Sequence, residues 1–205
     1  MKVSWPTRGR PGCDSLVDVL TLVRHGRTSA NATGRLQGCR TDPPLDEVGR
    51  AQADALLSAV HRIDRLIVSP ALRARQTAEV FGVDPEVDVR WQEMDYGDYD
   101  GMVIDQIPAD VWSGWTSNAE FAPHGGEALS VVEARVRAAC EDLIDDARHG
   151  DVVVVTHATP IKLAMAWALG VEPGIVWRSF VDQASVTRVA IRDRGPTLST
   201  FNLVP

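Results

Sequence analysis

Arginine and histidine side chains follow three apolar segments of this sequence, each at the point where the segment ends. Arg24 and His25 come directly after one segment, His157 follows another, and Arg73 lies one turn into a helix expected after the third. Two arginines beside two histidines would repel a metal cation. They suit a dianionic phosphate, because guanidinium groups bind such oxygens in a bidentate manner. These residues therefore indicate an anion site.

Apolar runs of strand length alternate with segments of helical periodicity, and this alternation must position the four side chains. The patterns predict strands at 16–23, 65–69, 85–90, 151–156, 184–191 and 197–202, with a hairpin turn at 194–196. They predict helices at 45–60, 70–81, 129–148 and 159–170, with Asp46 and Thr159 as N-caps and Pro70 and Pro160 as first helical residues.

This order of elements predicts one α/β domain with three layers, in which helices cover both faces of a mainly parallel sheet with an antiparallel edge. We expect residues 1–15, which mix proline, glycine and basic residues, to form a disordered lead-in, and residues 16–205 to form the domain. Because the carboxyl ends of parallel strands meet at one edge of a sheet, Arg24, His25, Arg73 and His157 are expected to converge.

Composition excludes several classes of partner. The chain has 205 residues, of which 28 are acidic and 21 basic, so its net charge of −7 opposes binding to nucleic acid or to an anionic membrane. It has no apolar run long enough for a spanning helix or a signal sequence, so a cytoplasmic protein is expected. Cys13, Cys39 and Cys140 lie far apart and are expected to be reduced thiols.

The segment LTLVRHGRTSAN resembles the signature of the histidine phosphatase (phosphoglycerate mutase-like) superfamily, and SPALRARQTA and VVVVTHATP resemble its second and third motifs. The resemblance runs from about residue 19 to residue 189. An RHG tripeptide alone is weak evidence, whereas all the motifs in order, each at a strand end, are strong evidence. The resemblance implies a phosphatase that hydrolyses a small phosphomonoester through a phosphohistidine, with no cofactor and no metal.

The resemblance also implies individual roles. His25 would be the nucleophile and Glu93 the acid/base, while the phosphate would be bound by Arg24, Asn31, Arg73, His157 and the small residue Ala158. Arg73 and Arg75 lie on different sides of their helix, so only one can enter the site, and the motif selects Arg73. Asp95, Asp98 and Asp100 stand close to Glu93, and a neighbouring aspartate could be the acid instead.

Alternative functions can be weighed against this one. A cofactor-dependent phosphoglycerate mutase of this family would need a long insertion between its acid and its second histidine, and the segment 93–157 is too short to include it. A non-catalytic phosphate-binding module on the same fold would be supported by a missing nucleophile or acid. An iron or zinc site made of His25, His157 and Glu93 is opposed by the two arginines.

The sequence alone does not assign a role to the aromatic segment, to Arg27 or to Glu127. The aromatic residues Trp112, Trp115 and Phe121 either form a lid over the substrate or pack their segment onto the domain. Arg27 reaches either substrate or solvent, and Glu127 is expected in the first turn of a helix without a clear catalytic role. The natural substrate and the oligomeric state, a homodimer included, are not determined by the sequence.

Overall fold

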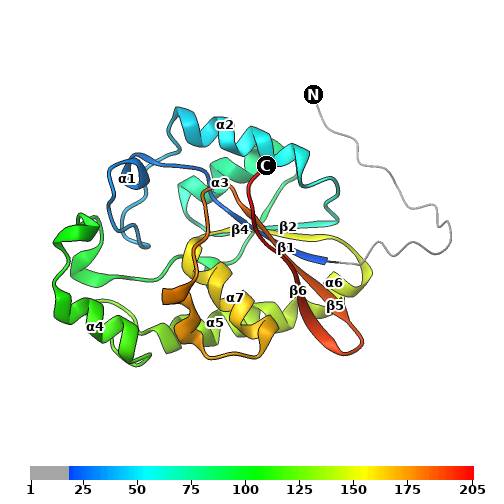
Figure 1. Ribbon diagram of the computed structural model, residues 1–205. Helices are drawn as coiled ribbons and strands as arrows, with labels where there is room; N and C mark the ends of the chain where they lie inside the picture. Colours follow the sequence, from blue (N-terminus) through cyan, green and yellow to red (C-terminus); the bar gives the residue numbers. More distant parts are fainter. Residues whose placement is uncertain (1–18) are drawn as a thin grey trace.

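The computed structural model describes residues 19–205, which fold around one six-stranded sheet (Figure 1). The expected lead-in at 1–15, Cys13 and the first residues of the strand expected from Leu16 lie outside the described residues. The strands are ordered β3-β2-β4-β1-β5-β6 across the sheet. Their bounds are Val19–Arg24 (β1), Arg65–Val68 (β2), Glu86–Val87 (β3), Val152–Thr156 (β4), Val186–Arg192 (β5) and Gly195–Leu203 (β6).

The sheet is parallel on one side and antiparallel on the other. Strands β3, β2, β4 and β1 pair in parallel, while β5 pairs antiparallel with both β1 and β6. This confirms the expected mainly parallel sheet with an antiparallel edge and a C-terminal hairpin. The carboxyl ends of β2, β4 and β1 therefore lie side by side, in the geometry in which α/β sheets bind ligands.

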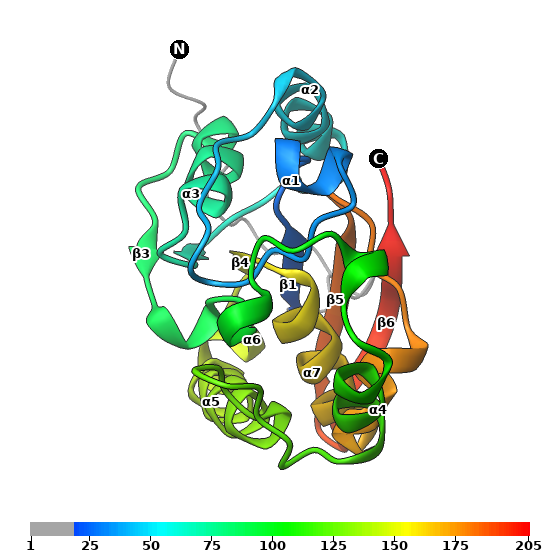
Figure 2. The same cartoon turned by 90° about the vertical axis from the view of Figure 1, so that its left-hand side faces the viewer.

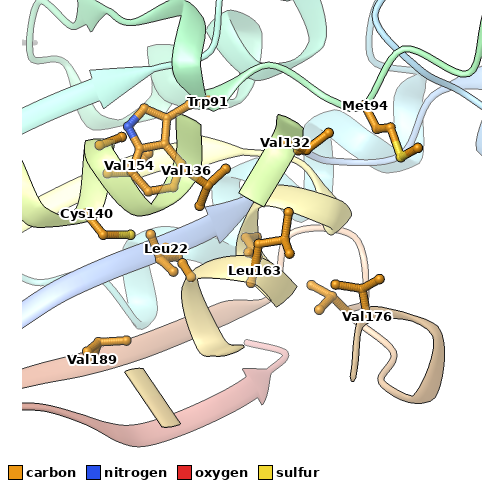
Figure 3. Close-up of a cluster of buried hydrophobic side chains, with 14 of the residues drawn as sticks. Leu22, Trp91, Met94, Val132, Val136, Cys140, Val154, Leu163, Val176 and Val189 are labelled. Carbon is orange, nitrogen blue, oxygen red and sulfur yellow. The ribbon is translucent and has the colours of Figure 1, made fainter. Parts of the chain in front are cut away.

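Helices cover both faces of the sheet (Figures 1 and 2). Along β4, Val152 and Val154 pack into one apolar cluster and Val153 and Val155 into another, as the two-residue period of a strand requires. The cluster with Val153 and Val155 includes residues of α3 (Leu72–Ala78), which packs next to α2 (Glu47–Ala55). The cluster with Val152 and Val154, part of which is drawn in Figure 3, includes residues of α5 (Leu129–Asp142), α6 (Ile144–His149) and α7 (Ala158–Leu169). The three-layer prediction is thus confirmed.

Two helix starts differ from the sequence-based expectation. Pro70 is not the first residue of α3, which begins at Leu72 after the N-cap Ala71. The carboxylate of Asp42, from a distant loop, accepts the Leu72 N–H and so replaces a local cap. Thr159 is not the N-cap of α7 either, because that position belongs to His157. The predicted cap Asp46 is confirmed, since its side chain accepts a hydrogen bond from the Gly49 N–H at 2.8 Å.

Three further segments depart from the predicted pattern. The helix expected at 129–148 is interrupted at Leu143, where α5 ends and α6 begins. Only Glu86–Val87 of the strand expected at 85–90 forms a strand, since the chain enters a 3₁₀ turn (η3, Val89–Trp91). The segment with Trp112 and Trp115 forms the helix α4 (Ala109–Ser117), whose weak apolar period concealed it. The short helix α1 (Ser29–Ala32) follows β1 closely.

A close contact between two glycines fixes the loop after β1 against α2. A methyl group on Gly26 would lie 2.4 Å from the carbonyl oxygen of Gly49, and one on Gly49 would lie 2.0 Å from that of Arg27. No larger side chain fits at either position without backbone movement. The loop that begins at His25 is therefore held rigidly over the edge of the sheet.

None of the helices within residues 19–205 is long and apolar enough to cross a membrane.

Candidate active site

The register of the central strands brings His25, His157 and Ser69 together. Arg24 at the end of β1 is paired with Thr156 at the end of β4, so His25 and His157 follow at the same level. Their rings lie 5.1 Å apart, centre to centre, and are inclined by 62°. Ser69 follows β2 on the other side of β4, so three adjacent strands each contribute one side chain.

The ring of His25 is buried and oriented by its own loop. Its Nδ1 lies 2.8 Å from the carbonyl oxygen of Gly26, and the Gly26 N–H is in turn bound by Thr77 at 3.0 Å. This contact assigns the ring proton to Nδ1 and leaves the lone pair on Nε2. Burial, followed by the charges of Arg73 and Arg24, holds the pKa of His25 well below its usual value. His25 is therefore a neutral imidazole with a free Nε2 at neutral pH.

In His157 the other ring nitrogen, Nε2, is the one that is bound, and its partner is Ser69. The Ser69 hydroxyl lies 2.7 Å from His157 Nε2 and accepts a hydrogen bond from the Ala71 N–H at 3.4 Å, and we assign the hydroxyl proton to the short contact with Nε2. The proton of His157 is thereby assigned to Nδ1, a buried donor without a partner among the described residues. Burial, followed by the charge of Arg73, also holds the pKa of His157 well below its usual value.

Arg73 is buried and is held mainly by backbone carbonyl groups. Its Nη2 donates to the carbonyl of Gly38 at 2.8 Å, and its Nη1 donates to that of Thr41 at 3.1 Å and approaches the half-exposed Asp42 carboxylate at 3.3 Å. The Nε donor has no partner among residues 19–205. Arg75, on the same helix, is exposed, so only Arg73 enters the site, as predicted.

Arg24 is held in the same manner from another segment. One of its Nη1 donors binds the carbonyl of Val181, which precedes β5, and its buried Nε has no partner within the described part of the chain. Burial lowers the pKa of both Arg24 and Arg73, and the charge of Glu93 partly opposes this shift. With the Nδ1 donor of His157, these groups form a positive site suited to an anion.

Glu93 is the buried acidic group of this site, while Asp42, the other carboxylate that lines it, is half-exposed. Glu93 is 5% exposed, its Oε1 accepts the Met94 N–H at 2.8 Å, and its Oε2 accepts the Thr159 N–H in the first turn of α7 at 3.3 Å. Glu93 lines a cavity of about 160 Å³ that extends from the buried Arg73 to the surface. The cavity is lined by Cys39, Asp42, Pro70, Ala71, Arg73, Gln92, Glu93 and His157.

The aspartates near Glu93 are engaged elsewhere. Asp95 pairs with Arg40 at 2.7 Å, and Asp98 pairs with His124 at the surface at 2.9 Å. Asp100 accepts hydrogen bonds from the 38–41 loop, including one from the Thr41 hydroxyl at 2.7 Å. None of the three lines the cavity that Glu93 lines, which favours Glu93 over its neighbours.

Four of the predicted site residues do not line this cavity, namely Arg24, His25, Asn31 and Ala158. Asn31 forms a capping box with Thr28, in which its amide oxygen accepts the Thr28 N–H at 3.1 Å, and its amide nitrogen remains as a donor. Ala158 is the first residue of α7. Their contact with phosphate stays a prediction. Arg27 makes an ion pair with Asp46 at 2.9 Å, so its side chain is held at α2.

One residue that orients the site, Ser69, was not identified from the sequence. Ser69 contacts His157, and the strand-end rule that identified the other residues would have found it, since it directly follows β2.

The aromatic segment packs onto the domain. Trp115 is buried, meets Trp112 edge to face, and stacks on Trp177 with ring centres 6.2 Å apart and planes 19° apart. Phe121 meets Trp115 edge to face, and none of these side chains lines the cavity. The packing alternative is therefore favoured over a lid. Glu127 lies just before the N-cap Ala128, not in the first turn of α5.

The described cysteines are free thiols. Cys39 is half-buried in the lining of the cavity, and burial raises its pKa to about 11. Cys140 is buried in the core, which also raises its pKa. Within residues 19–205, no three histidine, cysteine, aspartate or glutamate side chains are grouped so that they could hold a metal ion.

Comparison with known proteins agrees with this geometry. The sequence model of the histidine phosphatase superfamily (branch 1) matches residues 20–204. The chain belongs to this family. It is 31% identical to phosphoserine phosphatase 1 of Hydrogenobacter thermophilus over 196 residues, which cover 90% of this chain and 92% of that protein. It is 32% identical to the bifunctional protein Rv2228c of Mycobacterium tuberculosis over 82% of this chain, but spans only 49% of that protein.

A solved structure of the family superimposes closely. Mycobacterial glucosyl-3-phosphoglycerate phosphatase in complex with VO3 matches with a TM-score of 0.79 and 30% identity, over 90% of this chain and 98% of that one. The expected family and fold are thus confirmed, and the named relatives include phosphatases of small phosphorylated metabolites.

We expect Arg73→Lys to weaken the binding of vanadate by on the order of tenfold or more, because one ammonium group cannot replace a planar guanidinium that holds two carbonyls and an anion. Arg75→Lys is the matched control on the same helix and should bind as the wild type does. Isothermal titration calorimetry measures both affinities. Equal affinities in the two variants would place Arg73 outside the anion site.

Stability should fall as the pH drops below about 6.5, the pKa of an exposed histidine. Since the pKa of folded His25 and His157 lies well below that value, the unfolded chain takes up protons first. Their contribution is complete above about pH 6.5 and decreases at lower pH by up to about 1.4 kcal/mol per pH unit and histidine. Urea unfolding across this range in phosphate-free buffer measures the slope, which His25→Asn should reduce. An undiminished slope in that variant would contradict the assignment.

Proposed function

We propose that this protein is a phosphomonoesterase that hydrolyses a small phosphorylated metabolite through a phosphohistidine on His25. The observation that carries the proposal is the orientation of two imidazoles among buried guanidinium groups. His25 has its Nδ1 bound to the Gly26 carbonyl and its Nε2 free, while unpartnered donors on Arg24, Arg73 and His157 surround the same edge of the sheet. A nucleophile beside donors for three phosphate oxygens is the arrangement that phosphoryl transfer requires.

In the first step, Nε2 of His25 attacks phosphorus and the bond between phosphorus and the ester oxygen breaks. Arg24, Arg73 and the Nδ1–H of His157 bind the phosphoryl oxygens and stabilise the charge that develops on them. The Gly26 carbonyl accepts the Nδ1–H of His25 and so favours the positive charge that the ring acquires. Glu93 gives its proton to the leaving oxygen, and the alcohol departs.

In the second step, water attacks the phosphohistidine. Glu93, now ionised, takes a proton from this water, the bond between phosphorus and Nε2 breaks, and inorganic phosphate is released. His25 and Glu93 return to their starting states. The positive charge comes from arginines, so the proposal includes catalysis without a metal ion, with Asn31 and Ala158 as further phosphate contacts. A cytoplasmic location remains a prediction.

Hydrolysis is favoured over the alternatives by particular observations. The segment between Glu93 and His157 holds the one short helix α4 before α5, and the aromatic side chains Trp112, Trp115 and Phe121 do not line the cavity. A mutase would have to shield the phosphohistidine from water. A non-catalytic module is disfavoured because the residues proposed as nucleophile and acid, His25 and Glu93, are both present. The phosphatases among its relatives act, by name, on phosphoserine and glucosyl-3-phosphoglycerate, which places the proposed substrate among small phosphorylated metabolites.

Incubation with a radioactive phosphomonoester in the presence of EDTA should label the protein, because the proposed intermediate is a covalent phosphohistidine that needs no metal. The label should be stable to base and labile to acid, and it should be absent from His25→Ala. Rapid quenching followed by gel electrophoresis measures it. Labelling that persists in His25→Ala would refute the assignment of the nucleophile.

Glu93→Gln should depress kcat/KM far more for an alkyl phosphate than for p-nitrophenyl phosphate. An alkoxide leaves only with a proton, whereas nitrophenolate leaves readily without one, and general-acid help is worth about 10²–10⁴-fold. The ratio of the two kcat/KM values should therefore fall by at least about tenfold. Asp98→Asn, which removes a nearby exposed carboxylate, is the matched control and should leave the ratio unchanged. Equal losses for both substrates in Glu93→Gln would mean that another group supplies the proton.

A further inference from the structure

The guanidinium group of Arg135 on α5 binds the backbone of the loop that carries Glu93. Its Nη1 donates to the carbonyl of Arg90 at 2.6 Å and to that of Gln92 at 2.8 Å. Its Nη2 donates to the carbonyl of Glu93 itself at 3.3 Å and to the carboxylate of Glu127 at 2.8 Å. One side chain thus gathers three backbone acceptors of a single loop.

Glu127 completes this clamp from the other end of the loop. The carboxylate oxygen that pairs with Arg135 also accepts the Asp95 N–H at 2.9 Å, and the Glu127 N–H donates to the Asp95 carbonyl at 2.9 Å. The side chains of Arg135 and Glu127 are only 16% and 18% exposed, so water screens their pairing less than it screens the surface pairs of this protein. Glu93 therefore lies between two stretches of backbone fixed by the same ion pair.

This loop is not itself part of a strand or helix, so contacts from side chains hold it in place. The chain leaves the 3₁₀ turn η3 at Trp91 and has no ladder partner until well beyond Glu93. The carbonyl of Trp91, the remaining acceptor of this stretch, is bound by the hydroxyl of Thr156, which directly precedes His157. Trp91 lies in the same apolar cluster as Val132 and Val136 of α5 (Figure 3). The loop is thus tied both to α5 and to the end of β4.

From these contacts we propose that Arg135, assisted by Glu127, is a positioning residue that sets the place of the Glu93 carboxyl group in the cavity. The inference rests on the role of Glu93 as the acid in the proposed function. A general acid must lie within hydrogen-bond reach of the leaving oxygen. A displacement on the order of 1 Å at such a group costs on the order of 100-fold in rate. Arg135 does not line the cavity, so it acts through Glu93.

The test compares Arg135→Lys and Glu127→Gln with Arg137→Lys. Arg137 lies on the same helix, pairs with Glu133 at the surface at 2.8 Å, and serves as the matched control. For each variant, kcat/KM is measured with an alkyl phosphate and with p-nitrophenyl phosphate, and vanadate affinity is measured separately. Arg135→Lys and Glu127→Gln should each lower the alkyl-to-aryl ratio by on the order of tenfold while vanadate affinity stays near the wild-type value. Arg137→Lys should leave the ratio unchanged.

A double variant separates positioning from general damage to the fold. Once Glu93→Gln has removed the acid, adding Arg135→Lys should not lower the ratio further, because the two changes act on one group. Equal losses for both substrates in Arg135→Lys, or a further fall of the ratio in the double variant, would overturn the inference. Should Arg135→Lys fail to fold, Glu127→Gln decides in the same way, and an unchanged ratio refutes the clamp. An unchanged ratio in Glu93→Gln alone would instead refute the proposed acid.

Discussion

Two buried guanidinium groups whose charge is not fully neutralised set the conditions for the rest of this structure. A buried charge that is only partly balanced is costly, and the fold tolerates Arg24 and Arg73 because carbonyl dipoles orient both and the Asp42 carboxylate lies 3.3 Å from Arg73. Burial, followed by their positive charge, holds the pKa of His25 and His157 well below the usual value, so both imidazoles are neutral. In the proposed reaction one imidazole is the nucleophile and the other a donor, and the anion that would compensate the arginines is the group that is transferred.

The parallel part of the sheet brings His25, His157 and Ser69 to one edge. Because β1, β4 and β2 pair in register, the residues that follow them must lie at one level, and the first residues after each strand become the site. The close contact of Gly26, in the loop after β1, with Gly49 of α2 then fixes the position of His25. Glu93 is the exception, since it comes from a segment without regular structure and depends on long-range side-chain contacts for its position.

This difference explains which parts could be predicted from the sequence. His25 and His157 were proposed as site residues because buried strands are visible as apolar runs and the polar residue after each run is conspicuous, whereas Arg73 was selected by its motif. The start of α3 was misplaced because its cap, Asp42, is distant in sequence, and α4 was missed because its aromatic side chains pack on several sides. The choice among Glu93 and its neighbouring aspartates required coordinates, since partners such as Arg40 and His124 are remote along the chain.

The use of backbone carbonyls to hold the arginines has a consequence for how such a site diverges. Every residue type supplies a carbonyl group, so the positions that anchor Arg73 and Arg24, such as Thr41 and Val181, can exchange side chains over time without losing the acceptor. Substitutions at these positions are limited by the backbone path that places the carbonyl groups, and not by the chemical type of the side chain. A lineage can therefore change most of the sequence around the phosphate while the guanidinium geometry persists, which is consistent with a relative of 30% identity that still superimposes with a TM-score of 0.79.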